Sequence, residues 1–213
     1  MISQSSKETS KHSLAATSAQ RKGEEFRDLY FQSMVWAKTT WLGKNILKPV
    51  TDLWLYQEVI TKERPRVILE TGTRFGGSAH FFASILELSD NKDAIVISVD
   101  HLPERVEHHP QIRYLIGDSV APETLAHVKE LAPNGIDLLS LDSDHSPGHI
   151  LAELQAYGPL ASRGGLMVVE DHWINGADDP LRTWDAEGYD IDHSLQGKYL
   201  MSFGTWFRKK GTR

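Results

Sequence analysis

The segment RVILETGTRFGGSAHFFASILEL, residues 66–88, decides the fold class. It opens with a short apolar run, passes through a glycine-rich loop and continues as an apolar pattern of helical spacing. Runs of the same nearly continuous apolar character follow at residues 94–100, 112–118, 136–142 and 165–171. Such runs are typical of parallel strands that are buried on both faces.

Helical patterns separate most of these runs. We predict helices at residues 78–88, 121–131 and 147–160. The last has Ser146 as its N-cap and Pro147 at its first position. Because strands alternate with helices, we predict an α/β protein with a doubly wound, mostly parallel sheet. Residues 189–194 and 198–209 are strand-like with no helix between them, which predicts a closing antiparallel hairpin.

The chain is predicted to contain one domain behind a tail. Residues 1–23 are polar and lack periodicity, so we expect them to be disordered. Residues 24–213 form the expected single domain, with N-terminal helices in residues 24–64 and the sheet core in residues 65–213.

Two helices are predicted before the first strand, at residues 24–38 and 48–65, with Thr51 or Asp52 capping the second. This segment is rich in large aromatic side chains, namely Tyr30, Phe31, Trp36, Trp41, Trp54 and Tyr56. They exceed what two helices need to cover a sheet. We expect subunit contacts in a homo-oligomer or a lid over a ligand, with ordinary core packing as the alternative.

The composition limits the function. The chain has 213 residues, 40% of them hydrophobic, and no stretch approaches the roughly 18 uninterrupted apolar residues of a membrane span. The absence of cysteine excludes disulfides, thiolate metal sites and a cysteine nucleophile. A net charge of −6 argues against a nucleic-acid surface. With no signal-peptide pattern, we expect a cytoplasmic protein without nucleic-acid or membrane partners.

Every predicted parallel strand ends in a carboxylate. The acids are Glu70, Asp100, Asp118, Asp142 and the adjacent pair Glu170 and Asp171. Because ligands bind outside the carboxyl ends of strands in open α/β sheets, we expect these acids to face one crevice. The alternative is that they cap helices or terminate strands.

The glycine-rich loop after the first strand holds Gly72, Gly76 and Gly77. Glycines let the backbone pass close to a ligand and leave amides free at the start of the next helix. With an acid before it, the loop suits a ligand with an amine and a carboxylate, such as the methionine end of S-adenosylmethionine. Asp100 is placed to accept ribose hydroxyls. Asp118 and Ser119 would lie at the adenine, or form a simple turn.

Carboxylates also converge after two neighbouring strands. Asp144, Glu170 and Asp171 offer hard oxygen ligands, which suit Mg²⁺, Ca²⁺ or Mn²⁺. Without a cation, such groups would repel one another. Asp142 competes with Asp144 for the same role, and the spacing alone leaves both open.

Several motifs together resemble one family. The stretches DLWLYQE, ETGT, LDSDHS and VED, within a match over roughly residues 26–175, are similar to the cephalosporin hydroxylase and rhamnosyl O-methyltransferase family. The resemblance implies a Rossmann-like class I methyltransferase fold, homo-oligomers, S-adenosylmethionine and Mg²⁺. It implies metal ligands at Asp144, Glu170 and Asp171, in preference to Asp142. The cofactor contacts that we expect are Glu70, Thr71, Gly72, Thr73, Gly76, Ser78, Asp100, Asp118 and Ser119.

We therefore expect a Mg²⁺-dependent O-methyltransferase that acts on a hydroxyl of a small metabolite or natural product, sugar-bearing or aromatic. The metal would lower the pKa of the hydroxyl, and His145 or a metal-bound carboxylate such as Asp144 would take the proton. One alternative is a non-haem iron hydroxylase that uses His145 and His149. The other is an inactive methyltransferase-like binding or scaffold protein. The segment at residues 177–188, in which Asp179 is a predicted cap, is shorter than the family pattern implies and leaves the acceptor open.

Overall fold

A seven-stranded sheet with the order β5-β4-β3-β6-β7-β9-β8 forms the centre of the protein. The computed structural model describes residues 4–102, 104 and 106–211. The strands are β3 (Val67–Thr71), β4 (Ile95–Asp100), β5 (Ile112–Ile116), β6 (Ile136–Leu141), β7 (Ala161–Glu170), β8 (Tyr189–Ile191) and β9 (Gly204–Lys209). Strands β3 to β7 are mutually parallel, and β9 runs antiparallel to β7 and β8. The predicted doubly wound α/β fold with a C-terminal antiparallel hairpin is confirmed.

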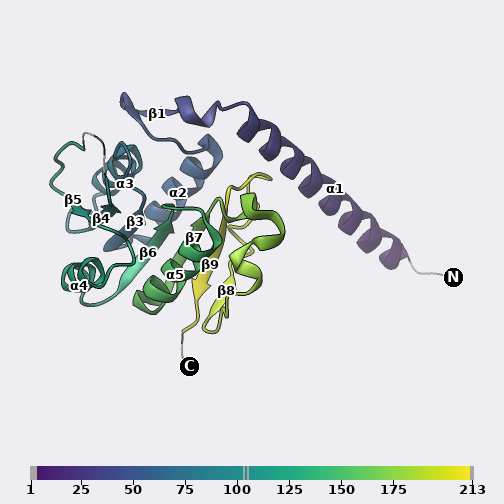
Figure 1. Cartoon of the computed structure of the whole chain (residues 1–213). Helices are drawn as coiled ribbons and strands as arrows, with labels where there is room; N and C mark the ends of the chain where they lie inside the picture. The colour runs from purple at the N-terminus through teal and green to yellow at the C-terminus, as the bar shows by residue number, and fades with distance from the viewer. Residues whose placement is uncertain (1–3, 103, 105, 212–213) are drawn as a thin grey trace.

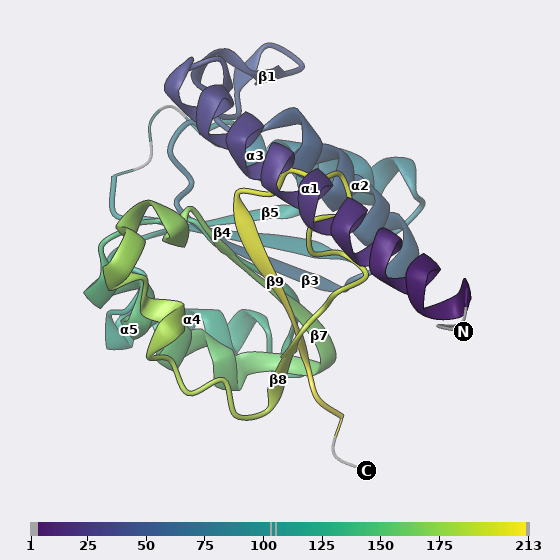
Figure 2. The same cartoon turned by 90° about the vertical axis from the view of Figure 1, so that its right-hand side faces the viewer.

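Helices cover both faces of the sheet, as Figure 1 and Figure 2 show. One face carries α2 (Val50–Glu63) and α3 (Gly77–Leu88), and the other carries α4 (Pro122–Leu131) and α5 (Pro147–Tyr157). Successive side chains of a strand point to opposite faces. Accordingly, Ile68 packs into the cluster beside α2 and α3, whereas Leu69 packs into the cluster beside α4 and α5. Two apolar cores therefore sandwich the sheet, which explains the unbroken apolar runs in the sequence.

The N-terminal segment differs from its prediction. The helix α1 (Gln4–Gln32) is continuous and extends away from the sheet in Figure 1, so the segment expected to be disordered is helical from Gln4. Residues 1–3 of that segment lie outside the described residues. The helix persists because its sequence lacks proline and is rich in Ala, Glu, Lys, Arg and Gln, which favour helices. No helix among the described residues, α1 included, has both the length and the apolar character to cross a bilayer.

The start of α2 also differs from its prediction. Pro49 is the N-cap, so Thr51 and Asp52 lie inside the first turn and the predicted cap is wrong. Asp52 is buried, and its Oδ2 accepts a hydrogen bond of 3.1 Å from the backbone N–H of Phe203. The carboxylate thus accepts a hydrogen bond from the segment that leads into β9 and does not cap the helix. The 3-10 helix η1 (Trp36–Lys38) and the short hairpin of β1 (Thr40–Trp41) and β2 (Lys44–Asn45) connect α1 to α2.

The C-terminal hairpin completes one edge of the sheet. Its second strand, β9, lies between β7 and the edge strand β8. The strand begins at Gly204, later than the predicted residue 198, since turns occupy the preceding residues. Gly204 pairs with Glu170, and a Cβ at Gly204 would lie 2.8 Å from the Glu170 Oε2. Short 3-10 helices fill the connections, namely η2 (Gly158–Leu160), η3 (His172–Asp178) and η4 (Pro180–Arg182). Asp179 caps η4 as predicted, accepting from the backbone N–H of Leu181.

Candidate active site

A cavity of about 960 Å³ opens at the carboxyl ends of the parallel strands, where ligands bind in this fold class. The loops that follow β3, β4, β5, β6 and β7 all contribute to its wall. The predicted site residues that line it, together with the competing Asp142, are Gly72, Thr73, Ser78, Asp100, Asp118, Ser119, Asp142, Asp144, His145 and Asp171. Other predicted residues are absent from this lining, namely Glu70, Thr71, Gly76 and Glu170. The structure thus gathers most of the predicted residues around one cavity.

The glycine loop passes very close to the end of β6. Gly72 has a φ of +86°, and a Cβ there would lie 1.9 Å from the carbonyl oxygen of Asp142. Gly76 has a φ of +73° and forms the N-cap of α3, while Gly77 packs against β2. Only glycine allows this combination of left-handed backbone and close approach. The loop therefore brings its backbone and the start of α3 to the cavity, beside the strand-end acids.

Glu70 is linked to the glycine loop by a chain of hydrogen bonds through Ser98 and Thr73. Its side chain is buried and accepts a hydrogen bond of 2.6 Å from the Ser98 hydroxyl. Burial raises the pKa of Glu70 to about 7, while hydrogen bonds from the Ser78 and Ser98 hydroxyls act to lower it. Ser98 in turn contacts the Thr73 hydroxyl at 2.7 Å. Glu70 is thus the base of a polar chain that reaches the cavity wall at Thr73.

Asp100 and Asp118 are oriented by backbone amides. Asp100 accepts hydrogen bonds from the N–H groups of Arg74 (2.8 Å) and Leu102 (2.9 Å). Asp118 accepts one from the N–H of Val120 at 3.0 Å. Fixed carboxylates of this kind at the wall of a cavity are ready to accept hydrogen bonds from the hydroxyl or amine groups of a ligand.

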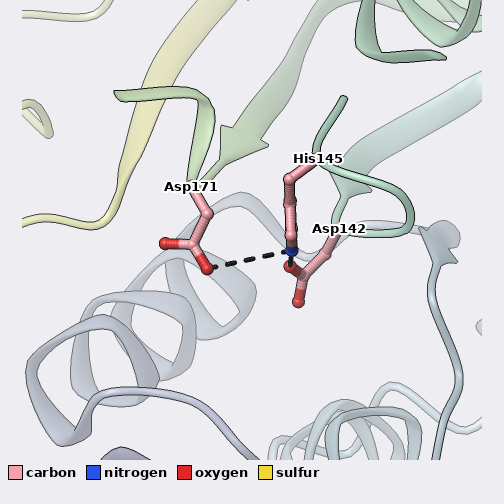
Figure 3. A group of neighbouring side chains, drawn as sticks. All are labelled: Asp142, His145 and Asp171. Carbon is pink, nitrogen blue, oxygen red and sulfur yellow. Dashed lines mark ion pairs between the residues drawn. The ribbon is translucent and has the colours of Figure 1, made fainter. Parts of the chain in front are cut away.

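Three side chains that line the cavity could hold a metal ion. One nitrogen or oxygen from each of Asp142, His145 and Asp171 lies within 4.8 Å of the others. Figure 3 shows these side chains pointing toward one another from the ends of β6 and β7. The His145 Nε2 is 3.7 Å from the Asp142 Oδ1 and 3.9 Å from the Asp171 Oδ2.

The state of Asp171 indicates that this cluster suits a cation. Its Oδ1 is buried and has no hydrogen-bond partner among the described residues. Burial, followed by the charges of Asp142 and Glu170, raises the pKa of Asp171 to about 7. Burying a carboxylate oxygen without a hydrogen-bond donor costs free energy. Converging carboxylates are the ligands that hard divalent cations prefer. The residues therefore fit a metal such as Mg²⁺.

The structure brings Asp142, instead of Asp144, next to Asp171. The Asp144 Oδ1 accepts a hydrogen bond of 2.8 Å from the backbone N–H of Ser146, at the start of α5. This hydrogen bond lowers the pKa of the Asp144 carboxyl. Asp144 lines the cavity but bonds to the turn that leads into α5, whereas Asp142, at the end of the buried strand, joins the metal-type cluster. The family resemblance had favoured the opposite choice.

Glu170 belongs to a buried network with a residue that sequence reasoning missed. The Glu170 Oε1 accepts hydrogen bonds from the Tyr56 hydroxyl (2.6 Å) and the Lys48 ammonium (3.2 Å). The same ammonium donates to the Asp142 Oδ2 at 2.7 Å. Burial lowers the pKa of Lys48, but the charges of Asp142 and Glu170 outweigh burial and hold this pKa well above its usual value. The only sequence signal was a lysine inside the apolar run ILKPV.

His149 lines the same cavity as His145 but does not join it in the metal-type cluster. The His149 Nε2 contacts the Ser119 hydroxyl at 3.0 Å and lies 3.5 Å from the Glu153 Oε1. The hydrogen bond to Glu153 raises the pKa of His149. In the described part of the chain, the metal-type cluster contains one histidine and two carboxylates. It therefore differs from the two-histidine, one-carboxylate set that the iron hypothesis needs.

Aromatic side chains from the N-terminal segment line the same cavity. Phe31 and Trp36 stack with their ring centroids 5.7 Å apart and an angle of 9° between their planes. Trp173 packs edge-on against Phe31 and lies under the guanidinium of Arg27, 4.1 Å from the ring centroid. Phe31 at the end of α1 and Trp36 in η1 thus form an apolar part of the cavity wall.

The sheet order, the glycine loop and the strand-end acids together define the Rossmann-like fold of class I methyltransferases. Solved structures have the same fold. A CmcI apo-structure matches with a TM-score of 0.66 and 20% identity, over 83% of this chain and 78% of that chain. A CmcI structure with Mg and SAM matches with a TM-score of 0.64 and 20% identity, over 81% and 77%.

The chain belongs to the Rhamnosyl O-methyltransferase/CmcI family, whose model matches residues 33–202. The rhamnosyl O-methyltransferase of Mycobacterium tuberculosis H37Rv is 38% identical over 159 residues, which are 72% of this chain and 64% of that protein. The rhamnosyl O-methyltransferase of Mycobacterium leprae is also 38% identical over 159 residues, 72% of this chain and 69% of that protein. The match to the M. tuberculosis protein thus spans less than two thirds of its length.

Proposed function

We propose that the protein is an S-adenosylmethionine-dependent and Mg²⁺-dependent O-methyltransferase. The observation that carries this proposal is the pair Asp142 and Asp171, with its unpartnered buried oxygen, in one cavity with the glycine loop. Membership of the family, the names of the rhamnosyl O-methyltransferases and the CmcI structure with Mg and SAM support it.

The cofactor would occupy the part of the cavity between the glycine loop and the loop after β5. Gly72, Thr73 and Ser78 would contact its amino-acid end, and Asp100 its ribose hydroxyls. Asp118 and Ser119 would contact the base. Glu70, Thr71 and Gly76 support this loop without lining the cavity. The cofactor supplies a methyl group on a sulfonium, which is the electrophile.

Asp142 and Asp171 would hold the metal ion, with Glu170 as the third carboxylate of the site. The ion supplies positive charge that lowers the pKa of an acceptor hydroxyl. His145 lies between the two aspartates and would accept the hydroxyl proton at Nε2. With its proton taken by His145, the acceptor oxygen would be presented to the methyl group that the bound cofactor would supply. Because reactants held in line react faster, the cavity walls contribute by orientation.

The acceptor would be a small hydroxylated metabolite or natural product, sugar-bearing or aromatic. Phe31 and Trp36 form an apolar wall against which such a molecule can pack. The proposal includes a single domain over residues 24–213, a cytoplasmic location and a homo-oligomer, with no nucleic-acid or membrane partner. Exposed apolar side chains on α1 and α2 support the oligomer.

Calorimetry with S-adenosylhomocysteine, followed by a Mn²⁺ titration of the same sample, tests the proposal. We expect the product cofactor to bind without metal, because the glycine loop and Asp100 do not depend on the ion. No binding at millimolar concentration would refute the methyltransferase assignment. Iron-dependent consumption of 2-oxoglutarate would favour the hydroxylase. Cofactor binding without turnover of any hydroxylated acceptor in a broad panel would favour a scaffold protein.

A further inference from the structure

The Lys48 ammonium is a buried cation in contact with Asp142 of the metal-type cluster and with the neighbouring Glu170. The residue is 4% exposed, and its Nζ contacts the Asp142 Oδ2 at 2.7 Å and the Glu170 Oε1 at 3.2 Å. The cavity lining does not include it, so it faces the acids and not the space for an acceptor. Its role must therefore be exerted through these carboxylates.

Lys48 brings a positive charge next to the acids at this end of the sheet. Its ammonium contacts the Asp142 and Glu170 carboxylates, and Asp142 lies with Asp171 in the metal-type cluster. A cation held by Asp142 and Asp171 would therefore meet the positive charge of Lys48 through the Asp142 carboxylate. Buried charge is stable only when it is compensated.

We propose that Lys48 is a positioning residue that lowers the negative charge of the metal site, so that the site discriminates against cations of higher charge. The proposal rests on the proposed function only in placing a cation at Asp142 and Asp171. Lys48 also holds one oxygen of Asp142, the Oδ2, which leaves the other, the Oδ1, on the side of His145 and Asp171.

The test replaces Lys48 by Met in the full chain and measures two ions. Mn²⁺ binding is followed by paramagnetic resonance and Tb³⁺ binding by luminescence. Loss of one nearby positive charge strengthens the attraction for every cation in proportion to the charge of the ion. We expect roughly tenfold tighter Mn²⁺ binding and roughly thirtyfold tighter Tb³⁺ binding, with a lower unfolding temperature in chelator. The ratio of Tb³⁺ to Mn²⁺ affinity therefore rises, which a purely structural role would not produce.

Matched variants separate charge from hydrogen bonding. Lys48→Gln keeps donor groups without the charge, and we expect the same changes, so a failure of Lys48→Met to fold does not end the test. Tyr56→Phe removes a hydrogen bond to Glu170 but no charge, and Lys198→Met removes an ion pair with Glu58 elsewhere on the surface. Neither should alter the ion preference.

The outcomes distinguish this inference from the proposed function. If the wild-type protein binds no Mn²⁺, the metal part of the proposed function fails, and this inference fails with it. If the wild-type protein binds Mn²⁺ but Lys48→Gln leaves the ratio of the two affinities unchanged, Lys48 does not set the charge, and only this inference is overturned. Weaker binding of both ions to Lys48→Gln would also overturn it.

Discussion

Asp142 and Asp144 are two positions apart, but their side chains bond to different parts of the structure. Asp142 follows the last residue of β6 and contacts Lys48, whereas Asp144 turns to the backbone of Ser146. At this scale, the local hydrogen bond decides which acid is available, because the Asp144 Oδ1 already accepts from the backbone N–H of Ser146. Alternation of side chains along the chain cannot reveal this difference.

The first prediction compares Asp142→Asn with Asp144→Asn. Asp142→Asn removes a negative charge from the metal-type cluster, so we expect Mn²⁺ affinity to fall by roughly tenfold or more. Asp144→Asn keeps an oxygen that can accept from the Ser146 N–H, so stability should change by less than about 1 kcal/mol and Mn²⁺ affinity by little. A Mn²⁺ titration and thermal unfolding in chelator measure both. If only Asp144→Asn loses the metal, Asp144 is the ligand after all.

The second prediction concerns pH and Glu70. Its pKa of about 7 in the folded protein lies above the ordinary value of 4.5, so the folded state retains the proton longer than the unfolded state. This group therefore makes the protein less stable as pH rises from 4.5 to 7, by up to about 3 kcal/mol. Glu70→Gln is neutral at every pH and should lose that contribution.

Denaturant unfolding of the wild-type protein and Glu70→Gln at pH 5 and pH 8 measures the difference. Asp171 contributes a slope of the same sign, because its folded pKa is also raised to about 7. Since Asp171 is present in both proteins, comparing them isolates the contribution of Glu70. If the free energy of unfolding changes equally in the two proteins between pH 5 and pH 8, folding does not raise the pKa of Glu70, and the prediction is wrong.

At the scale of elements, α5 joins two loops of the cavity through one buried carboxylate. Glu153 is 1% exposed, and its Oε1 accepts hydrogen bonds from Ser119 (2.5 Å) and Ser143 (2.7 Å). Ser119 follows β5, and Ser143 follows β6. Tyr157 of the same helix donates to the Ser119 carbonyl at 2.6 Å. The helix thus sets the distance between the two loops that would enclose the base of the cofactor.

The third prediction follows from this link. Glu153→Gln keeps the size of the side chain but removes its charge, which weakens both hydrogen bonds. We expect S-adenosylhomocysteine to bind roughly tenfold more weakly, with Mn²⁺ binding unchanged, because the metal-type cluster does not include this carboxylate. Calorimetry measures the affinity, and Glu123→Gln at the exposed start of α4 is the control. A loss of Mn²⁺ binding in Glu153→Gln would mean that the variant disturbs the whole site.

The elements that were predicted well are those with a strong local signal. Ser146 and Pro147 fixed the start of α5, and strands buried on both faces were found to within a few residues. The start of α2 was misassigned because Asp52 bonds to Phe203, a contact that no local pattern encodes. Likewise, the strand-end acids pointed to the cavity, but Lys48 contacts acids 94 and 122 positions away. Contacts of this range depend on the finished fold.

At the scale of the whole molecule, the N-terminal helices present apolar side chains to solvent. Phe26 and Leu29 on α1 are 53% and 62% exposed, and Val50 and Trp54 on α2 are 57% and 60% exposed. Apolar surface of this extent favours association. The same segment lines the cavity through Phe31, so packing between copies would also brace the wall of the site.

The fourth prediction is that the protein is larger than one chain in solution. We expect light scattering to give a mass that is a multiple of 24.0 kDa. Phe26→Glu combined with Leu29→Glu places charge on the exposed face of α1 and should shift the mass toward 24.0 kDa. Asp190→Asn with Glu187→Gln, away from α1, should leave the mass unchanged. A mass of 24.0 kDa for the wild-type protein at all concentrations would exclude association.

The position of β9 has a consequence for biosynthesis. Because β9 lies between β7 and β8, neither strand can complete its pairing until residues 204–209 have left the ribosome. During translation, the backbone groups of β7 that will pair with β9 remain unpaired, and β8 has no partner strand. An open edge can pair with other nascent chains, so this protein should depend on chaperones until synthesis of β9 is finished. Glu170, at the end of β7, gains its partner Gly204 only then, which makes the metal-type site among the last parts to mature.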